Sequence, residues 1–193
     1  MATDQQLPGG LSALDAKPGF AIWFTGLPAS GKTTLAQHLQ NRLAAQGIQV
    51  LLLDSDELRQ IFIPQSTYSP AERDWFYGSI TKLAVWLTAN GINVLIAATA
   101  NRRAYRQAAR DQIARFAEIY VNCSPQTCRQ RDPKGLYAAA QAGRIGHLPG
   151  AGDTYEPPLQ PEVVVNTEEI EPSAAVANIL TQLSKLWSYR ERH

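Results

Sequence analysis

Short apolar runs recur along the chain, and they predict the strands of a buried sheet. The runs are Phe20 to Thr25, Ile48 to Leu53, Ile92 to Ala98, Phe116 to Val121 and Val163 to Val165. None of them alternates between apolar and polar residues, which is typical of strands in a sheet that is covered on both faces. Turn residues or charges bound each run, so we expect five short strands.

Stretches with helical spacing separate these runs. They are Lys32 to Gln46, Pro70 to Ala89, Arg103 to Arg115 and Pro172 to Arg190. This alternation predicts the α/β class, with a mostly parallel five-stranded sheet as the middle of three layers and helices on both faces. We expect one domain over residues 20–193 after a flexible leader at residues 1–19, where Gly, Pro, Gln and Ser show little periodicity.

Local residue types support the helix boundaries. Ser69-Pro70-Ala71-Glu72 has the composition of a capping box with proline at the first helical position. Ser124-Pro125 repeats its first two residues. Gly47 and Gly91 each follow a helical run and precede a strand, where a left-handed residue ends a helix.

Composition excludes several classes of function. The chain has 193 residues, with 18 Lys and Arg against 17 Asp and Glu, for a net charge of +1. This balance argues against nucleic-acid binding, which usually needs a basic surface. Leu83 to Asn101 carries no charge, but Asn90, Gly91 and Asn93 interrupt it, so we expect a helix end and a strand instead of a membrane span.

The cysteines and the N-terminus favour a cytoplasmic protein. Cys123 and Cys128 have neither the number nor the spacing of a disulfide framework or a zinc site. Residues 1–17 lack the basic start and apolar block of a signal peptide.

A phosphate-binding loop follows the first predicted strand and opens the first predicted helix. Residues 26–33 read G-L-P-A-S-G-K-T, which matches the P-loop pattern at every fixed position. Backbone N–H groups and the helix N-terminus bind phosphates in this arrangement, so we expect a nucleoside triphosphate here. Lys32 should reach the β and γ phosphates, and the Thr33 hydroxyl should bind Mg²⁺. The predicted ATP-binding residues are Gly26, Leu27, Pro28, Ala29, Ser30, Gly31, Lys32, Thr33 and Thr34.

A P-loop leaves the reaction open among three classes. A GTPase would need an N-K-x-D motif, and no Asn-Lys pair occurs in the chain. A motor ATPase would need Asp-Glu after the second strand, but Ser55 follows Asp54. A small-molecule kinase needs a carboxylate and cations beside the phosphates, which Asp56 and Arg59 provide. Asp54 is a further candidate for Mg²⁺, through water, although it could instead only cap a helix that starts after Ser55.

Longer motifs in the same order resemble one family of P-loop kinases. Leu53 to Arg59 reads L-D-S-D-E-L-R, Arg131 to Tyr137 reads R-D-P-K-G-L-Y, and Tyr155 to Pro158 reads Y-E-P-P. With the P-loop and Arg103 to Arg110, these stretches are similar to the motifs of the adenylyl-sulfate (APS) kinase family from about Phe20 to Thr167. The resemblance implies a P-loop NTPase fold with a lid segment, and transfer of the ATP γ-phosphate to the 3′-hydroxyl of adenylyl sulfate during sulfate assimilation.

The resemblance also implies roles for matching residues. Asp56 would face the acceptor hydroxyl and, with Lys32, form the catalytic pair, while Arg131 would lie close to ATP. Lys134 would belong to the lid. The residues implied at the acceptor are Arg59, Tyr68, Arg73, Phe76, Arg103 and Lys134. We further expect nucleotide substrates and a homodimer.

Three departures from the family motifs fall in the acceptor half. Phe76 replaces an Asn, Ala100 replaces a Ser, and Leu148 replaces a Phe of the family pattern. Loss of a hydrogen-bonding Asn is worth about 1–3 kcal/mol, which is enough to change the preferred acceptor. The alternatives are therefore a kinase of another nucleotide or sugar-like hydroxyl, and a nucleotide-binding regulatory protein with little turnover.

The arginine-rich helix has a simpler default interpretation. Its arginines are Arg102, Arg103, Arg106, Arg110 and Arg115, and we expect a solvated helix face from all except Arg103.

Overall fold

The computed structural model describes residues 17–63 and 65–190. The large elements are β1 (Ala21–Thr25), α1 (Lys32–Ala44), β2 (Val50–Asp54), α2 (Ser55–Phe62), α3 (Pro70–Ala89), β3 (Asn93–Ala97), α4 (Arg103–Arg110), β4 (Phe116–Asn122), β7 (Val163–Asn166) and α7 (Pro172–Arg190). Between β4 and β7 lie four short elements, α5 (Pro125–Arg131), α6 (Leu136–Gln141), β5 (Leu148–Pro149) and β6 (Gly152–Asp153). Most of the predicted leader falls on residues 1–16, which lie outside the described residues.

Five parallel strands form the central sheet in the order β2-β3-β1-β4-β7. In the middle of the sheet, Ala21 of β1 is opposite Val94 of β3 on one side and Phe116 of β4 on the other. Each of the five apolar runs is one of these strands, so the predicted α/β fold with a parallel sheet is confirmed. Parallel strands place all their carboxyl ends at one edge, where such sheets bind ligands.

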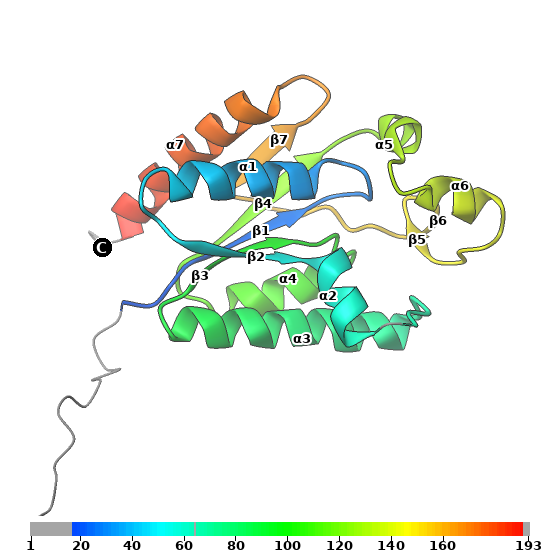
Figure 1. The fold of residues 1–193 in the computed structure, drawn as a ribbon, viewed down its shortest axis with the longest axis horizontal. Coiled ribbons are helices and arrows are strands. Elements are labelled where there is room, and N and C mark those ends of the chain that lie inside the picture. The colour runs from blue at the N-terminus through cyan, green and yellow to red at the C-terminus, as the bar shows by residue number, and fades with distance from the viewer. Residues whose placement is uncertain (1–16, 64, 191–193) are drawn as a thin grey trace, which may run out of the picture.

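The helices cover both faces of the sheet, as Figure 1 shows. Phe20, Ile22 and Phe24 pack on one face in a core cluster with α1 and α7. Ala21 and Trp23, between them in sequence, pack on the other face with α3 and α4. Because successive side chains of a strand point to opposite faces, one apolar run supplies both cores.

The helix caps agree with the predicted boundaries, with one correction. Ser69 Oγ accepts a hydrogen bond from the Glu72 N–H at 3.3 Å, and Ser124 Oγ accepts one from the Thr127 N–H at 3.1 Å. Gly47 and Gly91 have φ values of 76° and 78°, as expected for left-handed residues after a helix. The capping box predicted at Ser69 is incomplete, because the Glu72 carboxylate does not return to the Ser69 N–H. It binds Ser66, Thr67 and Arg59 instead.

The helix predicted for Arg103 to Arg115 is too long. It ends at Arg110, and the Ile113 N–H still bonds to the Ala109 carbonyl at 3.0 Å in a closing turn. The Arg115 carbonyl already accepts a bond from Ala21, which starts the sheet pairing of β4. No described helix is both long and apolar enough to span a bilayer.

Candidate active site

A cavity of about 980 Å³ lies at the carboxyl edge of the sheet. Its wall comes from the loop after β1, the start of α2, the first half of α3 and the segment from α5 to β5. This last segment, residues 125–149, lies at the right-hand end of the molecule in Figure 1. The predicted site residues on the wall are Pro28, Ala29, Gly31, Lys32, Thr33, Thr34, Asp56, Arg59, Tyr68, Arg73, Arg131 and Lys134. Those that do not line it are Gly26, Leu27, Ser30, Asp54, Phe76 and Arg103. Leu148, one of the positions that depart from the family motifs, also lines the cavity.

The P-loop wraps tightly between β1 and α1. Gly26 approaches the backbone of β4 so closely that an added Cβ would lie 2.4 Å from the Val121 carbonyl oxygen. Gly31 caps α1 with a φ of 102°, and Ala29 is also left-handed with a φ of 63°. Glycine is favoured where the chain needs a left-handed conformation or a close approach, so the motif's fixed glycines have a direct geometric reason.

Lys32 folds back over this loop. Its Nζ donates to the carbonyls of Gly26 at 3.2 Å and Leu27 at 2.8 Å. Burial lowers the pKa of Lys32 to about 8, although the carboxylates of Asp56 and Asp54 favour its charged form. A cation in this position is suited to binding phosphate oxygens, because a phosphate would replace uncharged carbonyls as its partner.

Thr33 lines the cavity, and its hydroxyl is held by Asp54, which lies directly behind the wall. Thr33 Oγ1 donates to Asp54 Oδ2 at 2.7 Å. Asp54 Oδ1 accepts from the backbone N–H of Asp56 at 2.8 Å, so Asp54 does cap α2. Hydroxyl and carboxylate oxygens are the donors that Mg²⁺ prefers, and a site of this kind takes its other ligands from water and substrate phosphates. The described residues contain no group of three or more His, Cys, Asp or Glu side chains that would hold a metal by themselves.

Asp56 and Lys134 meet across the mouth of the cavity. Lys134 Nζ forms an ion pair with Asp56 Oδ2, and both side chains are about half exposed. Burial lowers the pKa of Lys134, but the hydrogen bond and charge of Asp56 outweigh burial and raise it. The pair joins the start of α2 to the turn between α5 and α6, two segments 78 residues apart.

Arg59 lies between two aromatic rings. Its guanidinium is 4.6 Å from the Tyr68 ring centroid and 4.0 Å from that of Phe76. It also donates to Ser66 Oγ at 3.1 Å and pairs with Glu72. Phe76 is fully buried in the core on the α3 side, so its ring contacts the Arg59 guanidinium from the core and does not reach the cavity.

Arg73 connects α3 to the opposite wall. Only 5% of the residue is exposed, and its guanidinium binds the Asp153 carboxylate and the His147 carbonyl. Leu148, next to His147, belongs to a small cluster with Cys128 and Tyr137. This cluster packs on the P-loop, where the Tyr137 hydroxyl also donates to the Pro28 carbonyl at 3.2 Å.

Arg131 fastens the end of α5 to the segment after β7. It donates to Thr167 Oγ1 at 3.1 Å and to the Thr167 carbonyl at 2.7 Å. Thr167 Oγ1 in turn donates to the Ser30 carbonyl at 2.9 Å. Arg131 is therefore linked to the P-loop through Thr167, a contact that no motif indicated.

Arg103 lies away from the cavity. Its backbone N–H donates to Glu156 Oε2 at 2.8 Å, and its Nε is 3.5 Å from the same oxygen. Ala100, at the family's serine position, is buried with a φ of 41°. The structure also corrects the solvated-face expectation for Arg106, which is only 2% exposed. Only the charge of an arginine is visible in a sequence, whereas its burial depends on partners 12 and 50 residues away.

The chain matches known proteins over most of its length. The sequence model of the adenylylsulphate kinase family matches residues 18–166. An adenylyl-sulfate kinase of Synechococcus sp. (strain JA-3-3Ab) is 42% identical over 165 residues, which cover 86% of this chain and 94% of that protein.

Solved structures agree with the sequence match. The structure of the Mycobacterium tuberculosis APS kinase in complex with AMPPNP and APS superposes with a TM-score of 0.81 at 31% identity, covering 86% of this chain and 98% of that one. A hexameric APS kinase from Thiobacillus denitrificans gives a TM-score of 0.64 at 28% identity, covering 88% of this chain and 29% of that one. With the P-loop, the parallel sheet and the family match together, the chain belongs to the adenylylsulphate kinase family.

Proposed function

We propose that this protein transfers the γ-phosphate of ATP to the 3′-hydroxyl of adenylyl sulfate, giving 3′-phosphoadenylyl sulfate. Family membership supports the phosphotransferase activity. The observation that carries the proposal is the arrangement around Asp56, whose carboxylate lies in the wall of one cavity with P-loop Lys32 and the guanidinium groups of Arg59 and Arg73. Phosphoryl transfer needs positioning and charge neutralisation more than covalent chemistry, and this wall supplies both.

The donor half of the proposed site is the P-loop. Its backbone N–H groups and Lys32 would hold the ATP phosphates, with Arg131 beside them. Thr33 would bind Mg²⁺ directly and Asp54 through water, in keeping with their oxygen donors. When bound, the ion would neutralise charge on the phosphates. Lys32 would exchange the Gly26 and Leu27 carbonyls for the phosphate oxygens. There its charge would stabilise the negative charge that develops during transfer of the phosphoryl group.

The acceptor half is the side of Arg59 and Arg73. Both guanidinium groups are charged and nearly buried, which suits the phosphosulfate of the acceptor. Tyr68 would stack on the adenine with the ring face that Arg59 does not use. Asp56 would accept the proton of the attacking hydroxyl, and Lys134 would release Asp56 for this role when substrates enter.

The changed acceptor residues are compatible with adenylyl sulfate. Phe76 supports Arg59, so an apolar ring at this position preserves the cation that binds the acceptor. Arg103 is paired with Glu156 outside the cavity, which favours a structural role for it. The solved relative whose complex contains APS covers 86% of this chain, which supports the same acceptor here.

We also propose a homodimer located in the cytoplasm. A hexameric relative supports self-association in this family. The two buried cysteines are free thiols, in agreement with reducing surroundings.

The test is an acceptor panel. The purified full chain is incubated with ATP, Mg²⁺ and either adenylyl sulfate or one of several nucleotides and sugars, and ADP release is followed. We expect adenylyl sulfate to give the highest kcat/KM. Preference for another hydroxyl would support the alternative kinase, and ATP binding without turnover of any acceptor would support the regulatory alternative.

A further inference from the structure

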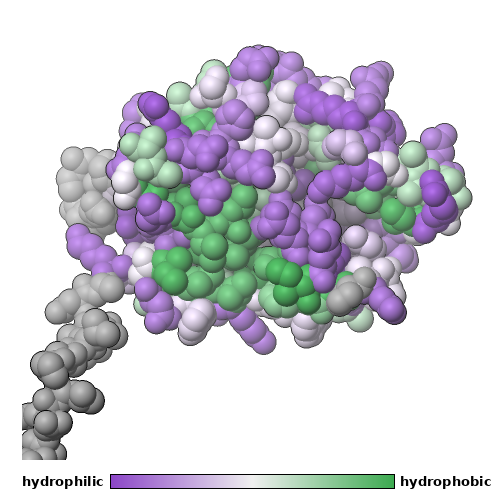
Figure 2. All heavy atoms as spheres, viewed as in Figure 1, coloured by the Kyte–Doolittle hydropathy of each residue, from purple (hydrophilic) through white to green (hydrophobic). Residues whose placement is uncertain are grey.

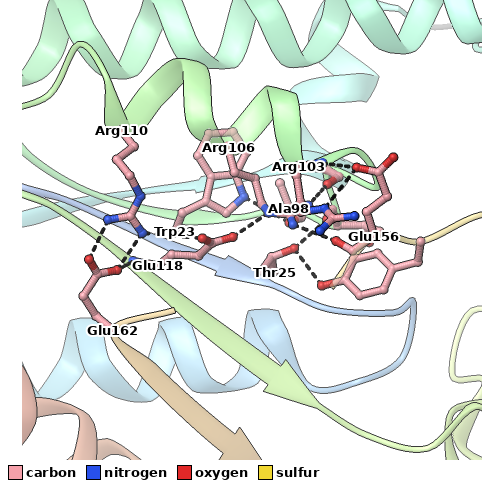
Figure 3. Close-up of polar contacts among 12 residues, drawn as sticks. Trp23, Thr25, Ala98, Arg103, Arg106, Arg110, Glu118, Glu156 and Glu162 are labelled. Carbon is pink, nitrogen blue, oxygen red and sulfur yellow. Dashed lines mark hydrogen bonds and ion pairs between the residues drawn. The ribbon is translucent and has the colours of Figure 1, made fainter. Parts of the chain in front are cut away.

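A buried arginine connects α4 to the segment between β6 and β7. Arg106 donates from Nε to Glu118 Oε1 at 2.5 Å, from Nη2 to the Glu156 carbonyl at 2.7 Å, and from Nη1 to the Ala100 carbonyl. Figure 3 shows the guanidinium in the middle of these contacts. All three of its nitrogens have acceptors, so the side chain joins the turn after β3, strand β4 and the segment around Glu156.

A second ion pair fastens the far end of that segment. Arg110 forms a two-pronged pair with Glu162, with distances of 2.5 and 2.8 Å (Figure 3). Glu162 Oε2 also accepts from the Glu118 N–H at 2.7 Å, and the Glu162 N–H bonds to the Glu118 carbonyl at 2.9 Å. The chain is thereby fixed to β4 where it enters β7.

The near end of the segment is held by hydrogen bonds. The Tyr155 hydroxyl lies 3.1 Å from that of Thr25, the last residue of β1. The Glu156 N–H donates to the Asn101 carbonyl at 2.8 Å, and Asn101 Nδ2 donates to the Thr154 carbonyl at 3.1 Å. The Glu156 carboxylate caps α4 through the backbone N–H of Arg103 at 2.8 Å.

These contacts lead directly to the cavity. Asp153, which precedes Thr154, holds the guanidinium of Arg73. Thr99, which lines the cavity, precedes Ala100, whose carbonyl Arg106 binds. Arg106 does not line the cavity itself. It instead binds two carbonyls that lie close in sequence to Thr99 and to Asp153, the residues that line the cavity or hold Arg73.

We propose that Arg106 is a positioning residue for the acceptor side of the site, an inference that rests on the proposed function. It acts through the segment 153–156 on Arg73. A guanidinium is needed because only its planar fork can serve a carboxylate and two carbonyls in different directions. The ATP side depends less on Arg106, since the P-loop is held by the pairing of β1 with β3 and β4.

The test compares Arg106→Lys with Arg102→Lys in the full chain. Lysine at 106 keeps the charge next to Glu118 but loses the fork. Arg102 is the N-cap of the same helix, its side chain is 48% exposed, and it pairs with the surface carboxylate of Asp74, so it serves as the matched control. For Arg106→Lys we expect the KM for adenylyl sulfate to rise about tenfold, with the KM for ATP within about twofold of wild type. Hydrogen exchange at the amide of Glu156 should also become faster.

A milder variant covers the case in which Arg106→Lys does not fold. Tyr155→Phe removes one hydroxyl that holds the same segment to Thr25, and we expect a rise of about threefold in the KM for adenylyl sulfate. An unchanged KM for adenylyl sulfate in every folded variant, or an equal rise in both Michaelis constants, would overturn the inference. A wild-type protein that does not use adenylyl sulfate would instead overturn the proposed function, and with it the acceptor part of this inference.

Discussion

Lys32 is an amine that the folded protein holds in a poorly solvated position. Burial lowers its pKa from 10.5 to about 8. Between these two pH values the unfolded chain holds more protons than the folded one, so this group makes the free energy of unfolding rise with pH. Below about pH 8 both states are protonated, and the cost of burying the charge is present in full.

Replacement of Lys32 by Met should therefore stabilise the protein while ending ATP turnover. Without nucleotide at pH 7 we expect the free energy of unfolding to increase by about 1–3 kcal/mol, since a partly buried and poorly solvated charge is removed. The difference from wild type should shrink as the pH rises from about 8 to 10.5. Urea denaturation at several pH values measures this, with exposed Lys82→Met on α3 as the control. A stability difference that is independent of pH would contradict the assignment.

Asp56 should matter for the chemical step more than for nucleotide binding. Asp56→Asn keeps the size of the side chain but removes the base, so we expect kcat to fall by roughly 100- to 10,000-fold. The KM for ATP should stay within about twofold, because the P-loop is unchanged. Glu57→Gln, one residue along α2 and exposed, is the matched control. Steady-state kinetics decide the point, and a normal kcat in the Asp56 variant would remove this carboxylate from the mechanism.

At the scale of elements, one carboxylate organises the turn that leads into α3. Burial raises the pKa of Glu72, but hydrogen bonds from Ser66 and Thr67 and the charge of Arg59 outweigh it and lower the pKa to about 2. A carboxyl whose folded pKa is depressed stabilises the protein above its unfolded pKa, near 4.5, and this contribution is lost as the pH falls toward 2. The turn carries Tyr68 in a left-handed conformation, with a φ of 56°.

Glu72→Gln tests this role of the turn. Loss of hydrogen bonds to a charged acceptor should lower the free energy of unfolding at pH 7 by about 1–3 kcal/mol. Between pH 4.5 and 2 the variant should lose less stability than wild type. Thermal unfolding across this range provides the measurement, again against Glu57→Gln. Parallel curves for the Glu72 variant and wild type would show that Glu72 is not the titrating group.

At the scale of the whole molecule, the two sheet edges differ in their surroundings. On the β2 edge, Leu51 is 45% exposed, and Ile48 and Ile92, which precede the paired strands β2 and β3, are exposed as well. Figure 2 shows apolar side chains gathered on this face, over β2 and the adjoining part of α3. An unpaired edge with an apolar surface is a natural place for a second copy of the chain to bind.

Leu51→Glu should therefore weaken the proposed dimer. We expect the wild-type chain to sediment as a dimer and the variant to shift toward monomer by at least tenfold in dissociation constant, because a charge must be buried at the contact. Leu159→Glu, at a 79% exposed residue that precedes β7 on the opposite edge, is the control. Sedimentation of wild type as a monomer at micromolar concentration would contradict the dimer, and an unchanged Leu51 variant would contradict its location.

The fold was predictable from the sequence because its signals are local. Each strand is a contiguous apolar run, and the P-loop is a contiguous motif. Residues that are adjacent in sequence are therefore enough to predict both. The burial of Arg106 and the position of Arg103 outside the cavity depend on contacts between distant segments. Spacing along the chain does not encode such contacts, and a helix of charged residues has the same pattern whether its arginines face water or buried carboxylates.

The position of the transferred phosphate tests the proposed reaction most directly. The wild-type chain is incubated with ATP, Mg²⁺ and either adenylyl sulfate or its 3′-deoxy analogue, and the product is analysed by phosphorus NMR and mass spectrometry. We expect one new phosphomonoester on the 3′-oxygen of adenylyl sulfate and none on the 3′-deoxy analogue. Phosphorylation of the analogue, or no phosphorylation of adenylyl sulfate, would contradict the proposed reaction.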